Sequence, residues 1–370
     1  MTKVLIVGGG LTSAVTASLL SKSTKFANSE LSIWDKARGS GGRMSTSRLT
    51  STTNTTCSAD LGAQYITATP DYAKLHADYY NDLKTNGILT PLELSIEGQK
   101  SNAPGTIDYV CPLGSSSIVK HFFKESSIDI KFGRQVTSLK NNVGNWTVTT
   151  KSGDTACFDA VILTMPVPQI LELLSNSPEI DDIVSNDSNS LTSQLKEVRY
   201  SSRYAIALLY DGNTESEKKS IYNTVQLDKG SCAKYIYGDE IFRYVSLDNY
   251  KRLNNPNPPI ADLLPMSVVF HTSVPFGIEH VEKSPEDVKP LLLQHIERLF
   301  PSWPKPTQVK CQKWRYSQVQ TPFPGSPGSV EISKSPLLLA GGDAFTHSNF
   351  DGCITSAEAI VEKYLSNIEI

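Results

Sequence analysis

The first 35 residues carry the pattern that most restricts the fold. A short apolar run at residues 3–7 is followed by three glycines at 8–10, and then by a largely apolar stretch at 11–20. A second β-type run at 31–34 ends at Asp35. This order predicts a strand, a glycine turn, a buried helix and a second strand. It is the βαβ unit of a parallel sheet, so we predict an α/β fold that begins with a Rossmann-type unit.

The glycine turn indicates a site for a diphosphate. Gly8 permits the tight bend, Gly10 lets the backbone approach a pyrophosphate, and the helix beyond supplies N–H groups and partial positive charge. Ser13 stands where a third glycine is usual, which we expect to cost little. Asp35 lies where a carboxylate accepts hydrogen bonds from ribose hydroxyls. At this point NAD and FAD are both open.

A second glycine loop favours a flavin. The sequence Arg-Gly-Ser-Gly-Gly-Arg-Met runs from Arg38 to Met44, directly after the ribose acid. Its glycines can wrap the same pyrophosphate, with Arg43 as the countercharge. An NAD dehydrogenase lacks such a segment.

The end of the chain supplies a second strand, glycine and helix arrangement. Gly341, Gly342 and Asp343 follow a predicted strand at 337–340, and the segment from Asn349 opens a helix predicted over 352–365. Asp343 can hold a ribityl hydroxyl. The N-terminus of the helix can stabilise negative charge at the pyrimidine edge of a flavin.

Eight segments together resemble the renalase family of the FAD-dependent amine-oxidase-like superfamily. The match runs through essentially the whole chain, and its segments lie at residues 34–37, 40–44, 60–66, 163–168, 200–205, 274–277, 310–319 and 348–357. The resemblance implies a two-domain α/β (α+β) flavoprotein. Its Rossmann-type FAD-binding domain would have p-hydroxybenzoate-hydroxylase-like topology, with an inserted mixed-sheet substrate domain.

The resemblance also implies an activity. Renalases oxidise the misreduced isomers of NAD(P)H, the 1,2- and 1,6-dihydro forms, to NAD(P)+, and pass electrons through FAD to O2 to give H2O2. A dihydropyridine gives up hydride because its ring becomes aromatic, so no side chain need remove a proton. We therefore predict no catalytic acid or base, only positioning of the substrate over flavin N5.

Site residues are predicted from the motifs and the resemblance together. The expected cofactor contacts are Gly8, Gly10, Thr12, Asp35, Lys36, Arg43, Met44, Gln64, Tyr65, Val136, Gly342, Asp343, Asn349, Gly352 and Ile354. The expected substrate contacts are Tyr65, His271, Trp314 and Arg315, where Trp314 could stack on a pyridine ring and Arg315 could meet phosphate or amide.

Two other functions stay open. One is a flavin amine oxidase acting on mono- or polyamines. That class often attaches FAD through a cysteine shortly before the last glycine motif, and no cysteine occurs between Trp314 and Gly341, so we expect non-covalent FAD. The other is a non-catalytic secreted signalling protein, which would leave the motifs near 64 and 343 idle.

Composition excludes several classes of partner. The net charge is −3 without a dense basic block, so nucleic acid is not expected. Six scattered cysteines and six histidines show no metal-ligand spacing, so we expect no metal site. No apolar stretch reaches the ~18 residues of a membrane span, and three glycines interrupt the only signal-like run. We expect a cytoplasmic monomer, or a chain secreted without a cleaved signal peptide, whose partners are dihydro-NAD(P) isomers and O2.

The 370 residues suffice for two domains, and the motifs make them discontinuous. We predict an FAD-binding domain from residues 1–75, 105–170 and 330–370, and a substrate domain from 76–104 and 171–329. An antiparallel meander is predicted from strands at 128–132, 134–139 and 146–150, and further strands at 159–164, 204–210 and 266–272. Ten Ser or Thr among residues 45–58 indicate a surface loop.

Overall fold

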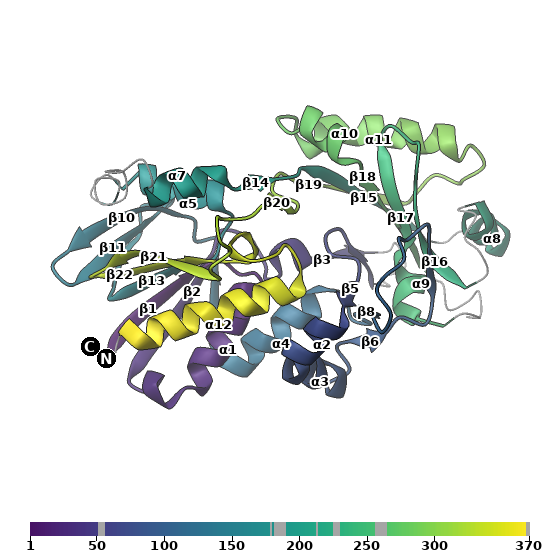
Figure 1. Cartoon of the computed structure of the whole chain (residues 1–370). Coiled ribbons are helices and arrows are strands. Elements are labelled where there is room, and N and C mark those ends of the chain that lie inside the picture. Colours follow the sequence, from purple (N-terminus) through teal and green to yellow (C-terminus); the bar gives the residue numbers. More distant parts are fainter. Residues whose placement is uncertain are drawn as a thin grey trace. The chain divides into compact units, whose positions relative to one another are not determined.

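The computed structural model describes residues 1–50, 56–177, 180, 190–211, 214–224, 230–255 and 265–367. The chain divides into two compact units, each built from separated segments (Figure 1). The first unit comprises Met1–Gly42, Ile118–Tyr200 and Gln318–Ile370. The second unit comprises Arg43–Ser117 and Ser201–Ser317.

These bounds differ from the predicted domains, although the discontinuous pattern is the same. Residues 43–75 and 105–117 belong to the second unit because Cys57, Ala59 and Leu61 pack on its main sheet. Residues 171–200 and 318–329 belong to the first unit, where Leu173 and Phe323 join the core. The prolines at 166 and 168 therefore do not mark the exit from the first unit. Pro166 is instead the N-cap of a helix that stays in it.

The first unit is centred on a six-stranded sheet in the order β21-β22-β13-β1-β2-β9. The strands from β22 to β9 are parallel, and β21 runs antiparallel to β22. The predicted first βαβ unit is confirmed. The strands are β1 (Thr2–Val7), β2 (Ser29–Asp35), β9 (Ile130–Phe132), β13 (Ala160–Leu163), β21 (Ser329–Lys334) and β22 (Leu337–Gly341).

Two helices from opposite ends of the chain lie side by side in the first unit: α1 (Leu11–Lys22) and α12 (Phe350–Asn367) (Figure 1). α1 is buried on nearly all sides, as the apolar run predicted. α12 buries Ala357, Ile360 and Tyr364. The first and last glycine motifs thus each open one of two neighbouring helices.

A three-stranded antiparallel meander is confirmed, with a correction. It consists of β10 (Val136–Asn142), β11 (Asn145–Thr150) and β12 (Thr155–Phe158), and Trp146 fixes it to the main sheet by donating to the Leu337 carbonyl at 3.0 Å. The strand predicted at 128–132 was wrongly placed in it. β9 instead pairs in parallel with β2, because Ile130 lies beside Ile33 in the main sheet. The other elements of the unit are α5 (Val167–Ser175), α7 (Leu191–Glu197), β14 (Arg199–Tyr200) and β20 (Val319–Thr321).

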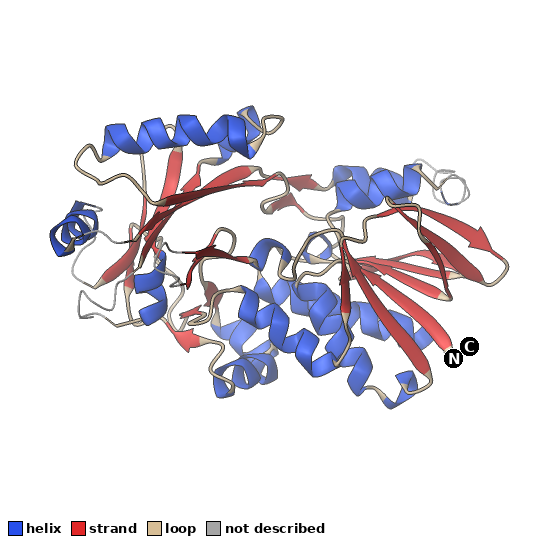
Figure 2. Cartoon of the chain, turned by 180° about the vertical axis from the view of Figure 1, so that it is seen from behind, coloured by secondary structure: helices blue, strands red, loops and turns tan. Residues whose placement is uncertain are grey.

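The second unit is centred on a six-stranded sheet in the order β19-β15-β18-β17-β16-β7. Its pairs are antiparallel except for β16 with β7. The helix α11 (Pro285–Leu299) covers one face through Val288, Leu292 and Ile296 (Figure 2). The strands are β7 (Ser95–Glu97), β15 (Arg203–Tyr210), β16 (Ser231–Tyr235), β17 (Phe242–Leu247), β18 (Met266–Thr272) and β19 (Gln308–Trp314).

The Ser/Thr-rich segment at 45–58 is a hairpin rather than the predicted surface loop. β3 (Thr46–Thr50) pairs with β4 (Thr56–Asp60), and residues 51–55 lie outside the described part of the chain. Thr is β-branched and suits a strand. Cys57 and Ala59 supply the alternating buried side chains that dock the hairpin on the face of the sheet opposite α11.

The remaining elements are short. They are η1 (Thr24–Phe26), η2 (Gly42–Met44), β5 (Ile66–Ala68), α2 (Pro70–Leu75), α3 (Ala77–Thr85), β6 (Thr90–Pro91), β8 (Ile107–Val110), α4 (Ser116–Ser126), α8 (Glu215–Thr224), α9 (Asp248–Leu253), α10 (Val274–Glu279) and η4 (Asp343–Phe345). All six cysteines are free thiols, and Cys57, Cys111 and Cys232 are buried. Among the described helices, none combines the length and apolar character that crossing a bilayer requires.

Candidate functional site

The first glycine turn is held tightly by backbone contacts. Gly8 has φ +125°, which favours glycine, and its N–H donates to the Trp34 carbonyl at 2.8 Å. A Cβ on Gly8 would lie 2.4 Å from Thr164 Oγ1. Asp35 reinforces the turn, because its carboxylate accepts from the N–H groups of Gly9 and Ala37.

The end of this turn is open where a diphosphate would lie. A Cβ added to Gly10 meets nothing within 4 Å. Gly10 is the N-cap of α1, so no side chain caps the helix, and no acidic residue lies in its first turn. Thr12 and Ser13 are buried in that turn. Free space, uncapped N–H groups and a positive helix end fit the pyrophosphate of a dinucleotide.

The second glycine loop folds onto the first. The Gly41 N–H donates to the Gly9 carbonyl at 2.8 Å, and a Cβ on Gly42 would lie 3.4 Å from the Gly10 Cα. Both Gly41 and Gly42 have positive φ. The two loops therefore form one glycine-lined cradle, as the motif predicted, with Asp35 at its base and the exposed Lys36 beside it. Whether Asp35 and Lys36 meet a ribose stays a prediction.

The last glycine motif builds the entrance to α12. Asp343 is 5% exposed and accepts a hydrogen bond from Ser348 Oγ at 2.8 Å. Asn349 caps the helix, since its Oδ1 accepts from the Gly352 N–H at 2.7 Å. A Cβ on Gly352 would lie 2.1 Å from the His347 carbonyl oxygen, so only glycine fits there.

Three further predicted contacts of the first unit have structural environments of their own. Ile354 is fully buried in the body of α12. Val136 begins β10 at an irregularity of the pairing with β11 and packs against the core. Gly342 has φ +130°, and its N–H donates to Ser356 Oγ at 2.7 Å. Their contact with a cofactor stays a prediction.

The other predicted cofactor residues lie in the second unit. Arg43 begins it, Met44 is buried at 8% exposure, and Gly62 packs against the Arg43 backbone. A Cβ on Gly62 would lie 1.9 Å from the Arg43 carbonyl oxygen. The same oxygen accepts a hydrogen bond from the Ala63 N–H at 3.0 Å, which holds it in this position. Gly62, the glycine of the Asp-Leu-Gly-Ala-Gln motif, is therefore required because any side chain would clash with the Arg43 backbone.

The amide of Gln64 is fixed at both ends. Its Oε1 accepts from Ser246 Oγ at 3.0 Å and from Lys251 Nζ at 3.1 Å. Its Nε2 donates to the Asp60 and Gly62 carbonyls and lies 3.2 Å from His271 Nε2. An ammonium group can only donate, so the contact with Lys251 determines which end of the amide faces His271.

Lys251 belongs to a buried ionic cluster. Asp248 accepts from Lys251 at 2.8 Å and from Arg252 at 2.5 Å, and Arg252 also lies 3.3 Å from Asp60. Burial acts to raise the pKa of Asp248, but Arg252 and Lys251 outweigh it and lower that pKa. Burial and the neighbouring Asp248 raise the pKa of Asp60. We interpret the role of the cluster as holding the segment from Asp60 to Gln64 in place, through Arg252 at one end and Lys251 at the other.

His271 is held in its neutral form. Burial, together with the charges of Arg203 and Lys251, lowers its pKa to about 3. Because Gln64 Nε2 is a donor, His271 Nε2 accepts and the proton of the ring sits on Nδ1.

Three tyrosines lie near His271 on the sheet face opposite α11. Tyr65 and Tyr235 share a hydrogen bond of 2.6 Å between their hydroxyls, and Tyr244 packs edge-on to His271 with ring centroids 5.8 Å apart. Burial raises the pKa of Tyr65 and that of Tyr244 well above their ordinary values. The Tyr244 hydroxyl is buried and bonds no described residue.

Trp314 and Arg315 have structural partners. Trp314 Nε1 donates to the Leu61 carbonyl at 2.6 Å, and its ring packs beside Gly62. Arg315 forms an ion pair with the exposed Glu282 at 2.7 Å and donates to the Val281 carbonyl. Their contact with substrate stays a prediction. Sequence reasoning missed four residues near Gln64 and His271. The pairing of β16, β17 and β18 brings Tyr235, Tyr244 and Ser246 there, and α9 brings Lys251.

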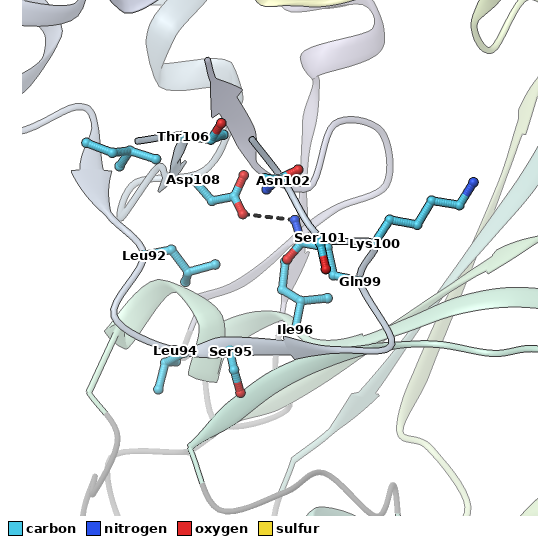
Figure 3. Close-up of a pocket in the computed structure, with 11 residues that line it drawn as sticks. Leu92, Leu94, Ser95, Ile96, Gln99, Lys100, Ser101, Asn102, Thr106 and Asp108 are labelled. Carbon is cyan, nitrogen blue, oxygen red and sulfur yellow. Dashed lines mark hydrogen bonds between the residues drawn. The ribbon is translucent and has the colours of Figure 1, made fainter. Parts of the chain in front are cut away.

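A separate pocket of about 490 Å³ lies in the second unit around residues 92–108 (Figure 3). Asp108 is its acidic group, but it already accepts from Thr67 Oγ1 at 2.5 Å and from Gln99 Nε2 at 2.9 Å. None of the predicted site residues lines this pocket. It therefore contributes nothing to the assignment of the flavin site.

Comparison with known proteins agrees with this geometry. A family described as an NAD(P)-binding Rossmann-like domain matches residues 6–83, and the flavin containing amine oxidoreductase family matches residues 61–362. Renalase from Mus musculus is 40% identical over 362 residues, which cover 98% of each chain.

Two solved structures share the fold. One, named as a protoporphyrinogen oxidase from Exiguobacterium sp., superposes with a TM-score of 0.67 at 12% identity, covering 100% of this chain and 99% of the other. The other, a variant of a putrescine oxidase, has a TM-score of 0.65 at 12% identity, covering 99% of each chain. At this identity the likeness concerns the fold alone. The match to the amine oxidoreductase family and the 40% identity to mouse renalase show that the chain belongs to the renalases, within the amine-oxidase-like flavoprotein superfamily.

Proposed function

We propose that this flavin-dependent oxidoreductase binds FAD non-covalently and oxidises 1,2- and 1,6-dihydro-NAD(P) to NAD(P)+, with O2 as the electron acceptor and H2O2 as the product. The first unit would bind the cofactor and the second unit would bind the substrate. A bound flavin accepts two electrons with a hydride and returns them to oxygen. The protein supplies binding, orientation and electrostatics.

The glycine cradle carries the cofactor part of the proposal. The open position at Gly10 and the uncapped start of α1 would receive the pyrophosphate. Asp35, held by the N–H groups of Gly9 and Ala37, would accept ribose hydroxyls with its remaining lone pairs. Asp343 and the start of α12 would lie toward the other end of the cofactor. Gln64 and Tyr65, which belong to the second unit, are proposed as further flavin contacts on the basis of the family resemblance.

The proposed substrate is supported by the protonation states of the titratable groups around Gln64. His271 is neutral with a pKa of about 3, and the pKa values of Tyr65 and Tyr244 are raised, so these three groups neither gain nor lose a proton near neutral pH. Such groups suit a substrate that needs no base. A dihydropyridine is one, because loss of hydride makes its ring aromatic.

The rival substrate is an amine. An aliphatic amine is a cation at neutral pH and must lose a proton before hydride can leave its α-carbon. A face whose His271, Tyr65 and Tyr244 do not titrate near neutral pH offers no base for that step. The Tyr65 and Tyr235 rings are the feature that would favour amines, since aromatic faces attract ammonium groups.

The experiment is anaerobic mixing of the FAD-loaded protein with 1,6-dihydro-NAD, and separately with a catecholamine and a polyamine, while the flavin absorbance is followed. We expect rapid bleaching by the dihydropyridine alone, and recovery with formation of H2O2 on admitting O2. Bleaching by an amine alone would overturn the proposal in favour of the amine oxidase. Protein that shows no flavin absorbance and gains no stability from added FAD would overturn both.

A further inference from the structure

Arg203 is a half-buried cation to which no described residue serves as a counterion. It begins β15 and faces the same side of the sheet as its register partner Trp314 and as His271, opposite α11. Its Nε is buried and forms no hydrogen bond with the described part of the chain. Among the residues that the structure describes, no carboxylate lies within ion-pair distance of its guanidinium. By contrast, Arg252 in the same unit has two carboxylate partners.

The surroundings of Arg203 add positive charge rather than removing it. Arg243 lies over the rings of Tyr235 and Tyr237, with 5.6 and 4.0 Å from its guanidinium carbon to the ring centroids. Burial lowers the pKa of Arg203, and the charge of Arg243 acts in the same direction, while Tyr235 acts to raise it. A guanidinium nevertheless stays protonated in proteins. Two cations therefore share this face.

The acids of the second unit near this face are already engaged. Asp248 is bonded to Lys251 and Arg252, and Asp108, whose charge acts on Tyr65, accepts from Thr67 and Gln99. A guanidinium taken out of water without a partner is unfavourable, and a bound anion would relieve that cost. The planar fork of arginine is matched in particular to phosphate and carboxylate oxygens.

Resting on the proposed function, we propose that Arg203 binds a phosphate group of the pyridine nucleotide, and that it is the residue of this face that selects anionic substrates over cationic amines. The hydroxyls of Tyr235 and Tyr65 lie on the same face, and the one that accepts in their mutual hydrogen bond keeps its own O–H to donate to a phosphate oxygen. His271 and Gln64 would then lie toward the uncharged ring and its amide. Arg203 is a binding residue in this account and takes no part in hydride transfer.

The test compares two substrates that differ only in the phosphate: 1,6-dihydronicotinamide mononucleotide and the uncharged 1,6-dihydronicotinamide riboside. Anaerobic stopped-flow reduction of the flavin gives a Kd and a limiting rate for each, in wild type and in Arg203→Gln. We expect the Kd of the mononucleotide to rise at least about tenfold in the variant, with the limiting rate and the Kd of the riboside nearly unchanged. Arg203→Lys should lie between, since it keeps the charge but not the fork.

Arg298→Gln is the matched control. It removes the same charge from the same unit, but Arg298 is exposed on α11, where it contacts His295. It should leave both substrates unaffected. Equal loss for the riboside and the mononucleotide in Arg203→Gln would overturn the proposal and make Arg203 a structural residue, as would no loss for either.

Failure of the proposed function is recognised separately. If wild type is reduced by neither dihydropyridine, calorimetric binding of inorganic pyrophosphate and of oxidised nicotinamide mononucleotide to wild type and variant still tests the anion site. We expect binding that Arg203→Gln weakens and Arg298→Gln does not. Equal binding by all three proteins would contradict the inference. If Arg203→Gln does not retain flavin, Arg203→Lys provides the same comparison.

Discussion

Lys251 Nζ lies 3.1 Å from Gln64 Oε1 and 2.8 Å from Asp248 Oδ1, with its side chain only 1% exposed. A fully buried cation thus fixes the orientation of the amide that we expect to contact the flavin. The other end of that amide faces His271, so substituting Lys251 should also change how Gln64 contacts His271.

Lys251→Met should destabilise the protein strongly. It leaves Asp248 with one cationic partner and Gln64 Oε1 with one donor, and removing one member of a buried ion pair typically costs about 3–5 kcal/mol. Urea unfolding of the purified protein measures the free energy. Lys234→Met is the control, because its partner Glu97 at 2.7 Å and Lys234 itself are both more than a quarter exposed, and we expect about 1 kcal/mol or less. Equal losses in the two variants would contradict a special role for Lys251.

Gly9→Ala and Gly10→Ala should separate folding from cofactor binding. A Cβ on Gly9 would lie 2.8 Å from Asp35 Oδ2, so we expect a loss of about 1–3 kcal/mol even without flavin. A Cβ on Gly10 meets no protein atom, so the flavin-free protein should keep its stability while its affinity for FAD falls at least about tenfold. Thermal unfolding of the flavin-free variants and FAD titration by fluorescence quenching measure the two effects. Unchanged FAD affinity in Gly10→Ala would remove Gly10 from the cradle.

Local sequence patterns were sufficient to predict the glycine cradle. Gly8, Gly10 and Asp35 lie within 28 consecutive residues, and a strand, a turn and a helix bring them together without help from the rest of the chain. The strand at 266–272 was likewise predicted with its observed bounds, because β-branched and aromatic residues such as Val268, Val269 and Phe270 are typical of a buried strand. The hairpin at 46–60 was not predicted, because many Ser and Thr residues are typical of a loop. Only its packing on the sheet of the second unit shows that the segment forms strands.

The face around Gln64 could not be predicted in the same way. Ser246, Lys251 and His271 are separated from Gln64 by more than 180 residues, and they meet it only through the register of β17 with β18 and the position of α9. Arg203 shows the same limit. Its segment was singled out by resemblance, but the absence of a carboxylate partner among the described residues is a property of the fold.

His271→Asn should flatten the pH dependence of stability below neutral pH. The folded-state pKa of His271 is about 3 against an ordinary value near 6.5, so between these values the unfolded chain binds a proton that the folded protein does not. Stability from this group is therefore full above pH 6.5 and is lost as pH falls, by up to about 1.4 kcal/mol per pH unit. We expect wild type to lose about 1–2 kcal/mol more than the variant between pH 7 and pH 5 in urea unfolding. Parallel losses would show that His271 titrates in the folded protein.

Trp314→Phe should reveal whether the indole serves the fold or the substrate. The indole N–H donates to the Leu61 carbonyl at 2.6 Å, next to the Gly62 backbone and the segment that ends in Gln64. Phenylalanine keeps an aromatic ring for stacking but leaves that carbonyl without its donor, so we expect a loss of about 1–3 kcal/mol. The limiting rate of flavin reduction should fall as Gln64 loosens, while the Kd for the dihydropyridine changes less than about twofold, since stacking is retained. Unfolding and stopped-flow reduction measure these quantities on one preparation. A variant that keeps its stability and rate but binds substrate poorly would instead assign Trp314 to direct contact with the pyridine ring.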